Sequence, residues 1–212
     1  MSYFMFDQSD TEALIVTDTL VTDIHDHPAM FAHKVWALPT MNLAIALTGT
    51  STVGDERYRC LSTVHGPRDI VELDGIAPDL LRAIHARVQH EHGPIGSSTV
   101  YVFGCPTGTS QLVRYTYRSV MDYESSSETG AATAVRPAPE TFEAEYPETR
   151  EDFVQLAVRV RDENDSGASP EPVAIGGDLF LTTVRDGLIG TEHLYRFADY
   201  EEHLAAMNGR NS

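Results

Sequence analysis

The sequence predicts an α+β fold in which two packed β-sheets lie between outer layers of helices. The first observation is the order of the segments: strands, two helices, strands, a helix, and strands again. The second is size, since 212 residues with 42% hydrophobic side chains can fill a substantial core. No repeat and no strong boundary interrupts the chain, so we expect a single domain spanning residues 1–212.

The first half of the chain is predicted to begin with strands and continue with helices. Four strands are expected, at 3–6, 12–17, 29–38 and 41–48. The first two are joined by the polar turn DQSDTE, and the second two flank Pro39. Two helices are expected next, at 51–64 and 77–91. The second helix repeats apolar residues at helical spacing and ends before Gly93 and Pro94.

The second half returns to strands. Segments 98–104 and 111–117 surround the turn CPTGT and form a predicted hairpin. The stretch 124–148 is rich in small, acidic and proline residues and is predicted to be a long surface loop. The remaining expected elements are a helix at 147–162, strands at 173–183 and 187–196, and a short helix in DYEEHLAAMN.

The charge and the chain start exclude several classes of protein. Asp and Glu outnumber Lys and Arg by 32 to 15, and the resulting charge of −17 repels nucleic-acid backbones and anionic lipid. We therefore expect no nucleic-acid or membrane partner. The start, MSYFMFDQSD, has neither the basic nor the apolar part of a signal peptide, and a cytoplasmic location is expected. The two cysteines, Cys60 and Cys105, are expected to be reduced thiols without a role.

Two charged residues stand among apolar neighbours. Asp18 ends the apolar run that begins at Ala13, and Lys34 is flanked by Phe31, Val35 and Trp36. A buried charge is costly unless an opposite charge lies close to it. Asp18 and Lys34 are therefore predicted partners if their strands are adjacent, with a surface salt bridge or two unrelated exposed charges as the alternatives.

The spacing of these residues resembles a known catalytic arrangement. Asp18, then Lys34 sixteen residues later, then ALTGTSTVGDE, is similar to proteasome β-type subunits and their bacterial relatives among the N-terminal nucleophile (Ntn) hydrolases. The resemblance implies a four-layer αββα sandwich of two antiparallel sheets. Counting back sixteen residues from Asp18 gives Ser2, which removal of Met1 would make the first residue.

The resemblance implies a role for each residue. Ser2 is the expected nucleophile, and its free α-amine, with a pKa of about 8, takes the hydroxyl proton. Lys34 is the electrostatic activator and Asp18 orients it. The backbone N–H of Gly49 in LTGT is the expected oxyanion donor, with a simple strand-to-helix turn as the alternative. Asp162 in VRDENDSG is expected to support the amine.

The resemblance also places a supporting serine in YESSSETGAA, where Ser127 and Thr129 are both candidates. Two features depart from the family pattern. The segment that usually holds two long helices has one predicted helix, and the nucleophile is serine in place of threonine.

The implied activity is hydrolysis of a peptide or small amide through an acyl-enzyme, without a cofactor or metal. The resemblance implies a homo-oligomer, a ring among the options, and allows an ATP-driven unfoldase as partner. Two alternatives stay open. One is a catalytically silent subunit with an assembly or binding role, and the other is an Ntn amidohydrolase that acts on a small molecule.

Overall fold

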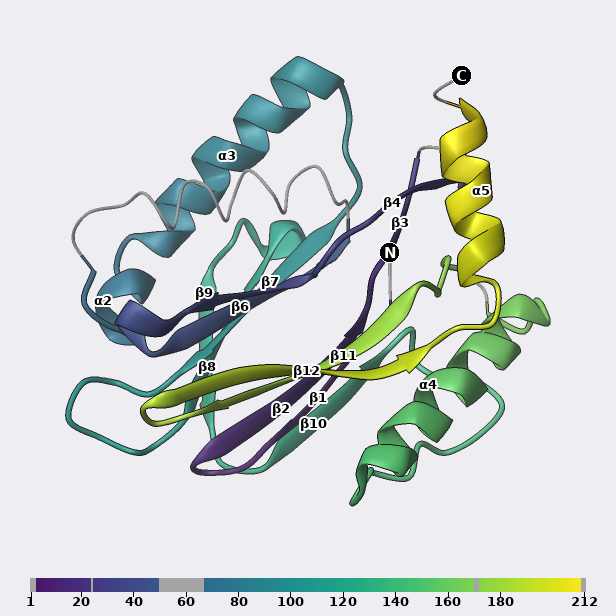
Figure 1. Ribbon diagram of the computed structural model, residues 1–212. Coiled ribbons are helices and arrows are strands. Elements are labelled where there is room, and N and C mark those ends of the chain that lie inside the picture. The colour runs from purple at the N-terminus through teal and green to yellow at the C-terminus, as the bar shows by residue number, and fades with distance from the viewer. Residues whose placement is uncertain (1–2, 24, 50–66, 170–171, 211–212) are drawn as a thin grey trace.

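The computed structural model describes residues 3–23, 25–49, 67–169 and 172–210. Two five-stranded antiparallel sheets are stacked face to face, and helices cover their outer faces (Figure 1). This arrangement confirms the predicted αββα sandwich. Of the helices in these ranges, none combines the length and the apolar composition that a bilayer crossing requires.

The first sheet contains the chain start and holds Asp18. Its spatial order is β10-β1-β2-β11-β12, and every neighbouring pair is antiparallel. Its strands are β1 (Phe4–Gln8), β2 (Glu12–Asp18), β10 (Ala132–Arg136), β11 (Asp178–Arg185) and β12 (Leu188–Arg196). In the pairing of β1 with β2, Phe4 lies opposite Thr17, so the beginning of β1 runs beside the end of β2.

The second sheet has the order β5-β6-β7-β8-β9 and is also antiparallel. Its strands are β5 (Val35–Leu38), β6 (Leu43–Gly49), β7 (Ser98–Gly104), β8 (Val113–Arg118) and β9 (Ser125–Thr129). A separate two-stranded hairpin, β3 (Leu20–Thr22) and β4 (Pro28–Phe31), connects the first sheet to the second.

The α-helices of the described ranges are α2 (Ile70–Asp74), α3 (Ala77–His92), α4 (Arg150–Asp165) and α5 (Tyr200–Arg210). Short 3-10 turns occur at Pro39–Met41 and Ser119–Met121. Asp69 caps α2 by accepting hydrogen bonds from two backbone N–H groups of the first turn. Thr149 and Asp152 form a reciprocal capping box at the start of α4.

Three apolar clusters hold the layers together. Between the sheets, aromatic side chains of β1 meet those of β7, and Phe4 stacks on Tyr101 with ring centroids 4.7 Å apart. The outer face of the first sheet packs against α4, and that of the second packs against α2 and α3. The helix α5 lies against the β3–β4 hairpin, where Tyr200 stacks on Phe31 (Figure 1).

Several predicted elements differ from those observed. The expected loop at 124–148 contains β9 and β10, which pair with β8 and β1. All five residues of β9 are exposed, so burial imposed no apolar alternation on its sequence. The expected strand at 29–38 is two strands, because the chain turns at His33 and Lys34 between β4 and β5.

Two further predictions were incomplete. Residues 173–177 lie outside β11, which begins at Asp178 after a Gly176–Gly177 turn. The helix α2 was not predicted, because its five residues span little more than one turn and carry no repeat. The expected helix at 51–64 lies outside the described residues.

Candidate active site

A buried ion pair connects the first sheet to the segment that leads into the second. The Nζ of Lys34 lies 2.6 Å from Oδ1 of Asp18, and it also donates to the carbonyl oxygen of Leu20 at 2.7 Å. Asp18 is 0% exposed and Lys34 is 8% exposed. The predicted pairing of these residues is therefore present, and it is shielded from solvent.

The β3–β4 hairpin explains how residues sixteen positions apart meet. The carboxylate of Asp23 accepts hydrogen bonds from the backbone N–H groups of His25 and His27, which stabilises the turn. The hairpin then pairs Leu20 with Phe31. Since the two arms run antiparallel, the residues just after β4 return to the level of Asp18.

Backbone N–H groups also donate hydrogen bonds to the Asp18 carboxylate. The N–H of Gly176 donates to Oδ2 at 3.1 Å, and the backbone N–H of Tyr3 is a further donor. Gly177 follows with φ of +79°, and a Cβ there would lie 2.4 Å from Oγ1 of Thr19. Only glycine fits this close approach, which brings the 176–177 turn against the end of β2.

Burial opposes both charges of the pair. It raises the pKa of the Asp18 carboxyl, and the Lys34 charge and the hydrogen bonds from Lys34, Gly176 and Tyr3 act in the opposite direction. Burial also lowers the pKa of the Lys34 ammonium, against the attraction of Asp18. Burial outweighs the mutual attraction, so the pKa of Asp18 stays above its ordinary value and that of Lys34 stays below it.

Lys34 is the single lysine of the whole chain, and the other fourteen cationic residues are arginine. Arginine carries a planar, permanently charged group, whereas lysine has a compact ammonium whose pKa responds to burial. An ammonium also fits the narrow space between one carboxylate and one carbonyl oxygen. The site therefore uses the one side chain of its kind in the sequence.

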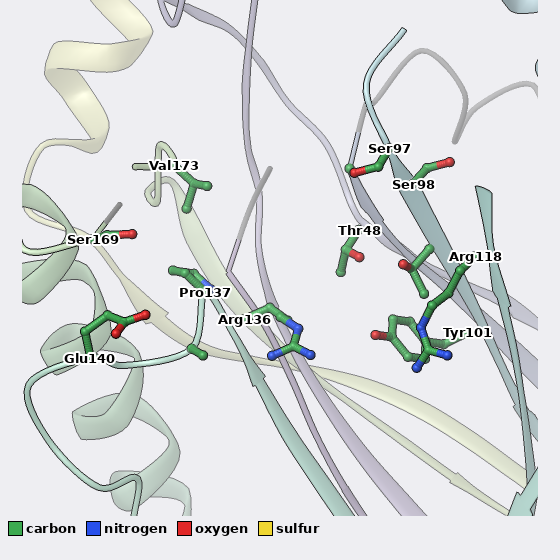
Figure 2. A pocket seen from close by; sticks show the side chains of 13 residues that line it. Thr48, Ser97, Ser98, Tyr101, Arg118, Arg136, Pro137, Glu140, Ser169 and Val173 are labelled. Carbon is green, nitrogen blue, oxygen red and sulfur yellow. The ribbon is translucent and has the colours of Figure 1, made fainter. Parts of the chain in front are cut away.

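Gly49 ends β6 in a conformation that favours glycine. Its φ is +111°, and a Cβ on it would lie 2.3 Å from the carbonyl oxygen of Ser97. It borders a cavity of about 270 Å³ that lies between residues of the two sheets (Figure 2). This position is compatible with the predicted oxyanion role, which stays a prediction.

The other predicted site residues lie elsewhere or outside the described ranges. Ser2 is outside the described residues. Asp162 is exposed on the last part of α4, where its carbonyl oxygen accepts the N–H of Ser166. Ser127 and Thr129 are exposed on β9, at the edge of the second sheet. In the part of the chain that is described, no contact joins these three side chains to Lys34 or Asp18.

Two features of this region were missed at the sequence level. The Gly176 donor was not predicted, although the adjacent glycines in AIGGDL signal a tight backbone approach before a strand. The cavity beside Gly49 is also lined by Arg118 and Arg136, which lie 18 residues apart in different sheets. No local sequence pattern predicts that these two arginines line one cavity.

Solved structures of similar shape include three Anbu proteins. An Anbu (ancestral beta-subunit) from Yersinia bercovieri has a TM-score of 0.57 at 12% identity, over 99% of this chain and 93% of that chain. The helical assembly of the Anbu complex from Pseudomonas aeruginosa gives a TM-score of 0.59 at 15% identity, over 99% and 92%. An Anbu mutant (Gly-1) from Hyphomicrobium sp. strain MC1 gives 0.57 at 12%, over 100% and 95%.

The chain has the Anbu fold. Coverage of nearly the full length of both chains confirms the predicted proteasome-like sandwich. No protein-family model matches the sequence, and no curated protein does. At 12–15% identity the likeness concerns the fold, and the chemistry of the site has to be argued from its own residues.

Proposed function

We propose that the chain is an Anbu-like subunit of the Ntn-hydrolase type that hydrolyses amide bonds with Ser2 after removal of Met1. The observation that carries the proposal is the buried Lys34–Asp18 pair, whose carboxylate accepts the backbone N–H of Tyr3. Tyr3 is the residue next to Ser2 in the sequence. A nucleophile at Ser2 would therefore lie near the Lys34 ammonium, whose pKa is lowered by burial.

The proposed reaction has two stages. In the first, the α-amine of Ser2 takes the proton of the Ser2 hydroxyl while Oγ attacks the amide carbon. The tetrahedral oxyanion is stabilised by the N–H of Gly49, the amine proton passes to the leaving nitrogen, and an ester to Ser2 forms. In the second, water attacks the ester carbon and gives a proton to the same amine. The bond from this carbon to Oγ then breaks, the acid leaves, and the amine returns its proton to Oγ of Ser2.

Lys34 and Asp18 act on this chemistry through charge. A nearby ammonium favours the neutral form of the α-amine, which is the form that accepts a proton, and it stabilises developing negative charge. Asp18 positions the ammonium, and in turn is held by Gly176 and Tyr3. Lys34 also bonds to the Leu20 carbonyl, so its position is set from two sides.

We also propose self-association. The Pseudomonas aeruginosa relative of this fold is described as a helical assembly. This chain would then form a homo-oligomer. The same proposal includes an ATP-driven unfoldase as its partner and a location in the cytoplasm.

The test begins with the intact mass of the untagged protein, which distinguishes retention from loss of Met1. Amide hydrolysis is then compared between the wild type and Ser2→Ala with fluorogenic peptides. Ser110→Ala, an exposed serine between β7 and β8, is the matched control. Loss of Met1 with activity abolished only in Ser2→Ala is expected. Retained Met1, or activity that survives Ser2→Ala, overturns the proposal.

One observation favours a second candidate, a catalytically silent subunit. Asp162, the predicted support for the amine, is exposed on α4 and has no contact with the Lys34–Asp18 pair. An assembly or binding subunit of the same fold needs no such support. Retention of Met1 with normal self-association would select this candidate.

A further inference from the structure

The cavity beside Gly49 is bordered by two cationic side chains from opposite sheets. Arg118 ends β8 of the second sheet, and Arg136 ends β10 of the first. Figure 2 shows Arg118 beside Tyr101 on one side of the pocket, and the guanidinium of Arg136 extending from the other side toward them. The hydroxyl of Tyr101 points into the same space.

These guanidinium groups differ from most others in the described chain. Arg68, Arg82, Arg114, Arg150, Arg161 and Arg196 each form an ion pair with a carboxylate. Within the same described ranges, Arg118 forms none, and Arg136 donates only to the carbonyl oxygen of Val135, at 3.4 Å. Within the described ranges, both guanidinium groups thus remain available to an anionic group in the pocket.

The remaining lining residues leave this part of the pocket positive. Among the described residues that line the pocket, Glu140 is the one acidic side chain, and Figure 2 places it on the side away from Arg118. Apart from Glu140 and the two arginines, the described lining residues are uncharged. The cavity of about 270 Å³ accommodates a group of several heavy atoms, such as an acidic side chain.

We propose that this pocket binds a carboxylate of the substrate, held between Arg118 and Arg136 next to Gly49. This inference rests on the proposed hydrolase function, because it specifies the substrate class of the same site. Guanidinium groups bind carboxylates through two parallel hydrogen bonds, which gives both strength and orientation. The carboxylate is supplied either by an acidic side chain or by the end of a peptide.

Binding is measured separately from hydrolysis, so that the two proposals fail independently. Calorimetric titration of the Ser2→Ala variant uses amide-capped tripeptides that end in glutamate, glutamine or lysine, and a neutral tripeptide with a free terminal carboxylate. The glutamate, glutamine and lysine peptides, with a fluorogenic amine in place of the amide cap, measure hydrolysis by the wild type. We expect the glutamate peptide to bind about tenfold more tightly than the glutamine peptide.

The variants Arg118→Gln and Arg136→Gln should each remove most of that preference, whereas Arg185→Gln should keep it. Arg185 is an exposed arginine at the end of β11 and does not line the pocket. A preference for the free terminal carboxylate alone would assign the pocket to a chain end. Equal binding of glutamate and glutamine peptides, with hydrolysis intact, overturns the pocket and keeps the hydrolase. Charge-selective binding without any hydrolysis supports the pocket and overturns the hydrolase.

Discussion

At the scale of single residues, the Lys34–Asp18 pair is the decisive feature of the site. Both side chains are enclosed, and the attraction between them offsets only part of the loss of hydration, since burial is the largest influence on both pKa values. Removal of one partner therefore has a different effect from removal of both, because a single substitution leaves an unpaired buried charge.

The substitution Lys34→Met should lower the free energy of unfolding by about 3–5 kcal/mol. The double variant Asp18→Asn/Lys34→Met should lose less, since it buries no unpaired charge. Denaturant unfolding of both variants at neutral pH checks this. An equal loss in the two variants would contradict an electrostatic origin.

The effect of Lys34→Met should also depend on pH. Burial raises the pKa of Asp18, and the variant lacks the Lys34 charge that opposes this rise. A folded-state pKa above the unfolded value gives stability that is present at low pH and is lost as the pH rises through the folded pKa. The difference between wild type and variant should therefore be smaller at about pH 4.5 than at about pH 7.5. A difference independent of pH would argue against titration of Asp18.

Gly49→Ala should destabilise the fold by more than about 1 kcal/mol, because the alanine would adopt an unfavourable φ and its Cβ would meet the Ser97 carbonyl. Gly190→Ala is the control, since Gly190 has no atom within 4 Å of a built Cβ. Thermal unfolding of both variants provides the measurement, and equal melting temperatures would be inconsistent with the close approach.

At the scale of elements, apolar patterning determined what the sequence could predict. The buried strands β1, β2, β6 and β7 carry near-continuous apolar runs and were predicted within a few residues. The exposed strand β9 consists of Ser, Glu and Thr, and its strand conformation depends on pairing with the preceding strand β8 and not on an apolar pattern of its own. A strand that is stabilised mainly by pairing with its neighbour cannot be recognised from its own residues.

The hairpin of β11 and β12 is joined at its open end by side chains. The Asp178 carboxylate accepts two hydrogen bonds from Arg196 and lies 3.0 Å from Nε2 of His193. The hydrogen bonds from Arg196, followed by those of His193, lower the pKa of Asp178.

Asp178→Asn should lower the free energy of unfolding by about 1 kcal/mol at neutral pH. A lowered folded-state pKa gives stability that is present above the unfolded pKa and is lost as the pH falls through the folded one, so the difference from wild type should shrink below about pH 4. Melting temperatures measured across this range check the prediction, with the exposed Glu143→Gln as control. A constant difference down to about pH 3 would exclude the ion pairs as its source.

At the scale of the whole molecule, the candidate site draws on both sheets and on the connection between them. The pair of Asp18 and Lys34 could be predicted because one hairpin brings them together, and spacing along the sequence records that. Arg118 and Arg136 come from different sheets and line one cavity because the two layers are stacked. Spacing along the sequence does not reveal such stacking, so this pocket could be found only from the structure.

The overall charge should control the proposed self-association. Copies that each carry −17 repel one another, and salt screens that repulsion with a Debye length of about 10 Å at 0.1 M. Light scattering should therefore report larger particles at about 0.5 M sodium chloride than at about 0.05 M. Particles that become smaller at high salt would indicate an interface held by ion pairs.

The presence of one lysine gives the molecule an unusual spectroscopic simplicity. Protein labelled with nitrogen-15 only at lysine would yield one side-chain ammonium resonance, from the group that bonds to Asp18 and to the Leu20 carbonyl. Apart from this group, amine-directed reagents find only the α-amine of the first residue. The protonation of the buried ammonium and the identity of the chain start can thus each be followed in the unmutated protein, without any overlapping signal.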